Sequence, residues 1–159
     1  MNLFARFSNF VAPPVILWPA LAAALLASPA AAEDKLPSPF SQEVLIKTSL
    51  LTLNDANVTG NYAVLHAKLA KTFREQFNPD KLKQAFKEFA DKKIDYDVVA
   101  AKSPIAVKDA QIDERGALQL RGYFDVSPSR ITYELDFIPS EGEWKPIKLN
   151  VDLKSAPEK

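Results

Sequence analysis

The chain has 159 residues, no cysteine, one histidine and equal numbers of acidic and basic side chains, so its formal net charge is zero. The absence of cysteine excludes disulfides, cysteine metal sites and thiol catalysis. A balanced charge gives no electrostatic attraction for nucleic acid, and we expect no nucleic-acid partner.

Residues 1–32 are typical of a secretory signal peptide. Arg6 is their only charged residue and precedes an apolar run rich in alanine and leucine. Ala30 and Ala32 supply the small residues of an Ala-x-Ala site, which predicts cleavage before Glu33. The alternative is an uncleaved membrane anchor, since the apolar run approaches the length of about 20 residues that a span needs. Its prolines favour cleavage, and we predict a periplasmic or secreted bacterial protein that meets the membrane only if this segment is retained.

Residues 33–41 contain two prolines and are predicted to form an extended leader, and residues 42–159 to form a single domain. The domain begins with a predicted helix over Gln42–Leu53, capped by Ser41. The turn-forming run Asn54–Asn57 is expected to end this helix. Two adjoining apolar rows predict that the helix is largely buried. The rows consist of Phe40, Val44 and Leu51, and of Ile46, Leu50 and Leu53.

Two further helices are predicted over Tyr62–Phe77 and Pro79–Asp91, each with one apolar face that is rich in aromatic residues. Asn61 and Asn78 precede them and have side chains suited to helix capping. The proline after Asn78 would occupy the first helical position, where its missing amide costs nothing.

The spacing of apolar residues then changes from helical to alternating. Alternation predicts a strand over Ile94–Val98 and another over Ile105–Ile112, the latter with a bulge near Lys108. Three more strands joined by tight turns are predicted within Ala117–Leu153, forming a meander with one apolar and one charged face. Pro146 cannot donate to a strand ladder, which indicates an edge position or a bulge there.

This order of elements predicts an α+β fold in which three N-terminal helices pack on a strongly curved antiparallel sheet of about five strands. The order, the size and the run Leu51–Phe77 resemble the nuclear transport factor 2-like superfamily, the ketosteroid-isomerase-like and cystatin-like cones. Within that run, the polar turn Asn54–Asn61 precedes a helix that opens Tyr62-Ala63-Val64-Leu65. The resemblance implies a cone with an internal cavity.

Enzymes of that superfamily place an acid or a histidine–acid pair inside the cone, as the resemblance implies. The acids on the predicted strands instead have outward parity, which disfavours an isomerase-like or dehydratase-like activity. These acids are Asp95, Asp97, Asp125, Glu134, Asp136 and Asp152. Because Asp95 and Asp97 also lack the ligand count and glycine of a calcium loop, we predict neither a metal site nor a cofactor.

The sequence does not predict a catalytic residue. His66, on the inward face of the second predicted helix, is the one candidate. The alternative for His66, which we favour, is a core histidine bonded to a tyrosine or a backbone carbonyl. Inward side chains could line a ligand cavity, or could fill the core by ordinary packing. The candidates are Tyr62, His66, Tyr96, Phe124, Tyr133, Phe137 and Trp144.

These observations predict an exported binding or accessory module that takes an apolar small molecule or an envelope protein and is a monomer or homodimer. Two other hypotheses stay open. One is a superfamily enzyme that acts on a small hydrophobic substrate, and the other is a purely structural envelope domain.

Overall fold

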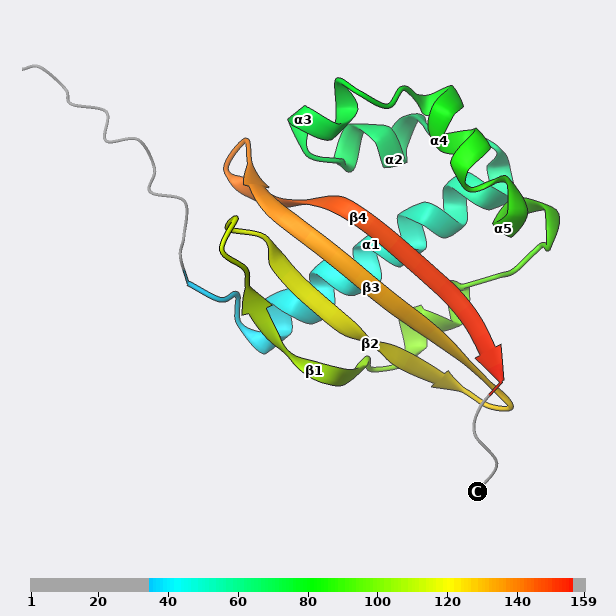
Figure 1. Cartoon of the computed structure of the whole chain (residues 1–159). Coiled ribbons are helices and arrows are strands. Elements are labelled where there is room, and N and C mark those ends of the chain that lie inside the picture. The colour runs from blue at the N-terminus through cyan, green and yellow to red at the C-terminus, as the bar shows by residue number, and fades with distance from the viewer. Residues whose placement is uncertain (1–34, 156–159) are drawn as a thin grey trace, which may run out of the picture.

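The computed structural model describes residues 35–155, which form helices followed by a four-stranded antiparallel sheet (Figure 1). The predicted signal peptide and its cleavage site lie outside these residues. None of the helices within 35–155 has the length and apolar character needed to cross a membrane. The helices are α1 (Pro39–Thr59), α2 (Ala63–Lys68), α3 (Lys71–Arg74), α4 (Pro79–Ala85), α5 (Lys87–Asp91) and the 3₁₀ helix η1 (Asp97–Ala101).

Helix α1 is longer than predicted at both ends. Ser38, rather than Ser41, caps it: the Ser38 hydroxyl accepts from the Ser41 amide at 3.1 Å, and a proline occupies the first turn. The helix runs through Asn54–Asn57 and ends at Gly60, whose positive φ of 67° is the left-handed cap conformation. The turn predicted at Asn54–Asn57 is wrong because those asparagines are buried and bonded within the tertiary structure.

The second predicted helix is divided into α2 and α3. The chain is extended at Leu69 and Ala70, and the Ala70 amide donates to the carbonyl of Pro146 at 3.1 Å. This hydrogen bond ties the helical layer to the sheet and takes the amide out of the helical ladder. The third predicted helix likewise divides at Phe86 into α4 and α5, and its predicted cap is confirmed: Asn78 accepts from the Lys81 amide at 2.9 Å.

The strand predicted over Ile94–Val98 is absent; the chain there forms a loop and then η1. The Tyr96 amide donates to the side chain of Asn54, and the Asp97 amide donates to the carboxylate of Asp95. These local bonds satisfy the donors that a strand ladder would need. The alternation of the sequence therefore reflects a buried Tyr96 between two polar turn residues and not a strand.

The sheet contains β1 (Ile105–Ile112), β2 (Leu118–Val126), β3 (Ser129–Ser140) and β4 (Glu143–Ser155) in sequence order. The meander is confirmed, and its register pairs Leu135 with Leu149. Register shifts occur in β1 around Lys108, as predicted, and opposite the Asp136–Phe137 step, where the partner is Pro146 on the edge strand β4.

The sheet has four strands rather than five and is neither strongly curled nor closed. β2 and β3 pair residue by residue without a shift, so no bulge bends the sheet between its two central strands. Figure 1 shows α1 crossing behind the sheet, while α2 to α5 gather beyond the β4 edge. The apolar sheet face and the inner row of α1 share one hydrophobic cluster, which includes Leu50, Leu53, Phe124 and Phe137.

Candidate functional site

An open apolar groove lies between α1, the end of α2 and the start of β4. Its volume is about 530 Å³. Along α1 it is lined by the row that contains Phe40 and Val44, whose side chains are 76% and 46% exposed. The prediction that this helix is largely buried therefore does not hold for the outer row that contains Phe40 and Val44. Two apolar rows were recognised, but the sheet covers only the inner one.

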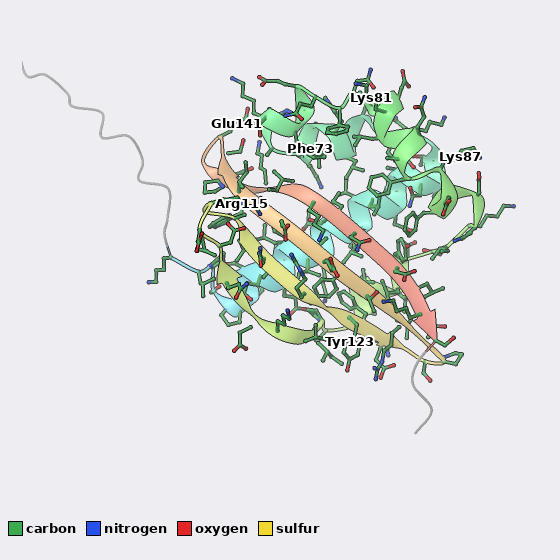
Figure 2. The ribbon with its side chains drawn as sticks, in the orientation of Figure 1. Phe73, Lys81, Lys87, Arg115, Tyr123 and Glu141 are labelled. Carbon is green, nitrogen blue, oxygen red and sulfur yellow. The ribbon has the colours of Figure 1, made fainter. Side chains whose placement is uncertain are left out.

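The opposite wall of the groove comes from the sheet and from α2. Trp144 and Pro146 have the same parity on β4, so both turn toward the helices, and Phe137 lies beside Pro146 in register. Leu65 contributes from α2. The neighbouring tip of the β3–β4 hairpin is held against α3, because Arg74 donates to both carboxylate oxygens of Glu141 at 2.9 and 3.0 Å. Figure 2 labels Glu141 at this tip.

The contacts of Glu141 with Arg74 and Lys145, which we call the hairpin clamp, are electrostatic. Hydrogen bonds from Lys145 and from Arg74 hold the pKa of the Glu141 carboxyl below its usual value. The Lys145 ammonium lies 2.7 Å from the same carboxylate, so this cation beside the groove is already paired. The clamp fixes the position of the wall that carries Trp144.

Lys68, the last residue of α2, also lines the groove. Its ammonium donates to the Thr52 hydroxyl at 2.8 Å, and both residues line the groove. Thr52 is buried and Lys68 is exposed, so their hydrogen bond lies at the edge of the domain. The spacing of charges along the sequence does not reveal that Lys68 lies beside an apolar wall.

The seven residues predicted to line a cavity are placed differently from one another. Tyr62, Tyr96, Phe124, Tyr133 and Phe137 are all buried in the core, with Phe124 and Tyr133 rings 5.8 Å apart. Phe137 also reaches the floor of the groove, and Trp144 forms its wall. His66 is half-buried on α2 and does not line this groove.

The ring of His66 is held by the backbone. Its Nε2 atom lies 3.2 Å from the carbonyl oxygen of Arg74, which follows eight residues later in α3. This contact bridges the two short helices across their break. The ring is thus engaged in joining α2 to α3, the arrangement expected of a structural histidine.

Two buried tyrosines have contrasting hydroxyl groups. The Tyr62 hydroxyl donates to the side-chain oxygen of Asn57 at 2.6 Å. The Tyr96 hydroxyl is buried without a hydrogen-bond partner among residues 35–155. Burial, with a contribution from the Asp152 carboxylate, raises the pKa of Tyr96 to about 12. Burial alone raises the pKa of Tyr133 to about 12 as well.

A second hollow, of about 820 Å³, lies on the outer face of the sheet and has a mixed polar lining. Its charges are largely matched: Lys148 donates to Glu134 at 2.7 Å, and the guanidinium of Arg130 lies 4.3 Å from the centre of the Tyr123 ring. Figure 2 labels Tyr123 near one end of this face. Arg121 forms an ion pair with Asp136, and the Asp136 side chain is buried. Such a self-paired face is typical of a solvated sheet surface.

In the part of the chain that the structure describes, no three acidic or histidine side chains converge so as to hold a metal ion. Asp95 and Asp97 instead accept hydrogen bonds from the side-chain amide of Asn54, at 3.1 and 2.8 Å. Comparison with protein-family models, curated proteins and solved structures finds no match to this chain.

Proposed function

We propose that this protein is a small exported binding module that holds an apolar ligand in the groove between α1, α2 and β4. The observation that carries the proposal is the exposed row of Phe40 and Val44 facing Trp144 and Pro146. An open apolar surface of this kind costs solubility unless something occupies it. The volume of about 530 Å³ falls within the range of roughly 300–1,000 Å³ typical of small-ligand sites.

The proposal moves the ligand from the interior of the domain to its side. Rings such as Phe124 and Tyr96 fill the interior, where they pack against α1. Phe137 and Trp144, two of the predicted lining residues, face the groove. Membership of the nuclear transport factor 2-like superfamily is part of the proposal, supported by helices that precede an antiparallel sheet.

Export belongs to the same proposal and rests on residues 1–32. The apolar run and the Ala30-x-Ala32 site support removal of this segment and release into the periplasm or medium. Intact mass measurement of the protein from the bacterial envelope tests this: a chain beginning at Glu33 is expected. A chain that retains Met1 and stays with the membrane fraction would contradict it.

Binding can be read directly from tryptophan fluorescence. The sequence contains two tryptophans, Trp18 and Trp144, so Trp18→Phe leaves the groove residue as the one emitter, whether or not the leader is removed. Titration with an environment-sensitive apolar dye is expected to quench or shift Trp144 emission saturably. The absence of any saturable change would overturn the proposed function.

Two valines on α1 give a matched pair of variants. Val44 lines the groove, and Val58, 71% exposed, does not. Val44→Gln is expected to weaken dye binding about tenfold, because roughly 1.4 kcal/mol of apolar contact is lost. Val58→Gln is expected to leave binding unchanged. Equal effects of the two substitutions would show that the dye binds elsewhere.

A further inference from the structure

The groove changes character along its length. Its α1 wall runs from Phe40 to Thr52, a distance of about 18 Å at the helical rise of 1.5 Å per residue. The outer part of this wall carries Phe40, Val44 and Leu45, together with the hydroxyl group of Ser41. The inner part carries hydroxyl groups, on Thr48, Ser49 and Thr52. The α1 wall therefore becomes richer in hydroxyl groups toward Thr52, and we call this the polar end of the groove.

Lys68 stands at the polar end. Its ammonium has three N–H donors, one of which is directed at the Thr52 hydroxyl at 2.8 Å. Among residues 35–155, no carboxylate oxygen lies within ion-pairing distance of this ammonium. A cation beside an apolar wall, with donors to spare and no acidic partner, is suited to an anion.

The other charges of the lining do not compete for this role. Lys145 is paired with Glu141 at the hairpin tip. Glu143 also lines the groove, at the first position of β4, but no ion pair joins it to Lys68. Lys68 is therefore a cation of the lining without a carboxylate in ion-pairing distance, and a ligand with one negative charge can supply that partner.

We propose, on the basis of the function proposed above, that the ligand is a single-chain amphiphile with a carboxylate head, a free fatty acid. The carboxylate accepts from Lys68 and lies beside the Thr52 hydroxyl. The acyl chain extends along α1 between Val44 and Trp144 and ends near Phe40. A monoanionic head matches one cation better than a phosphate dianion would. A groove of about 530 Å³ suits one chain rather than a two-chain lipid.

The ligand class can be tested with two matched series of compounds and Trp144 emission in the Trp18→Phe chain. Saturated carboxylates of about eight to fourteen carbons are expected to gain about fourfold in affinity per methylene until the chain overruns the groove. The corresponding primary alcohols have the same tails without the charge. They are expected to bind at least about tenfold more weakly than the carboxylates of equal length.

Lys68→Met is the diagnostic variant, and Lys71→Met is its control, since Lys71 is exposed on α3 and does not line the groove. The first substitution is expected to lower carboxylate affinity at least about tenfold and to leave alcohol affinity unchanged. The control is expected to change neither. Lys68→Gln provides a second, polar replacement should the methionine variant lose its cooperative urea transition.

The outcomes separate the ligand class from the function itself. If carboxylates and alcohols bind equally well, and Lys68→Met affects neither, the fatty-acid assignment is overturned while apolar binding in the groove stands. If neither series perturbs Trp144 at any chain length, the groove is not a binding site, and both proposals fall together.

Discussion

Asn54 provides the sharpest test of how the helical part is joined to the rest of the fold. This residue is 2% exposed in the middle of α1, and its side chain makes three hydrogen bonds to the 95–97 segment. Its oxygen accepts from the Tyr96 amide at 2.9 Å, and its nitrogen donates to Asp95 and Asp97. The segment before η1 is therefore held by one amide group.

Asn54→Asp keeps the size of the side chain and the acceptor for Tyr96, but replaces the donor with a third carboxylate. Each lost hydrogen bond to a charged acceptor costs about 1.5–3 kcal/mol, and like-charge repulsion adds to this. We expect a total loss of about 3–5 kcal/mol in the free energy of unfolding at pH 7. At pH 4 the loss is expected to fall by about half or more, because the carboxyl introduced at position 54, crowded by two others, can take up a proton and donate again.

Urea unfolding followed by circular dichroism at both pH values measures this loss in the free energy of unfolding. The control is Asp55→Asn, which alters the charge of an exposed neighbour on the same helix and is expected to change stability by less than about 0.5 kcal/mol. A loss below about 1 kcal/mol for Asn54→Asp at pH 7, or an equal loss at pH 7 and pH 4, would refute the role assigned to this residue.

Four further changes probe the core. Tyr62→Phe removes the donor to Asn57 and should cost about 1–2 kcal/mol, whereas Tyr96→Phe removes a buried hydroxyl without a partner and should cost nothing or stabilise. The pKa of Tyr96 is raised to about 12 in the folded protein, so the folded state holds this proton more tightly than the unfolded state. The resulting contribution to stability is complete below pH 10 and is lost as the pH rises to 12. Tyr96→Phe should therefore reduce the loss of stability between pH 10 and 12. Gly122→Ala should cost about 1–3 kcal/mol, since its Cβ would lie 2.3 Å from a carbonyl oxygen of β1. Phe137→Ala, in a fully buried position, should cost about 3–5 kcal/mol.

Urea and thermal unfolding of the same four variants provide the measurements. Equal losses for the two tyrosine variants would contradict the assigned hydrogen bonding. An alanine at position 122 that leaves stability unchanged would mean that β1 can move away from β2 without cost. A loss well under 1 kcal/mol for Phe137→Ala would contradict the parity of β3.

The sheet was predictable because its signal is local. Period-two alternation places Tyr133 inside and Glu134 outside, and the structure has both there. The position of Pro146 was also predictable, since a residue without an amide donor fits an edge strand or an irregular register. These features depend on the chain's own pleat and need no knowledge of distant partners.

The helical half was less predictable because its boundaries depend on contacts made far along the chain. Asn54 has the composition of a turn, but Tyr96 and its acidic neighbours satisfy it inside a helix. Ala70 is a good helix former, but the carbonyl of Pro146 takes its amide. Tertiary hydrogen bonds outweighed local preference at both places.

The groove was missed for a related reason. The rows on α1 indicated an apolar surface wider than one face, and this width was the available signal. Periodicity shows that Phe40 and Val44 share a face, but it does not show whether that face meets a sheet or solvent. Lys68 carried no signal at all, because its significance depends on Thr52, sixteen residues earlier in the chain.

The central claim is that the groove along α1 holds an acyl carboxylate, and a crystal structure of the complex with a terminally brominated fatty acid tests it most directly. We expect the anomalous bromine peak near Phe40 and Val44, with the carboxylate at Lys68. A peak on the outer sheet face beside Tyr123, or a groove that stays empty at saturating ligand, would contradict the claim.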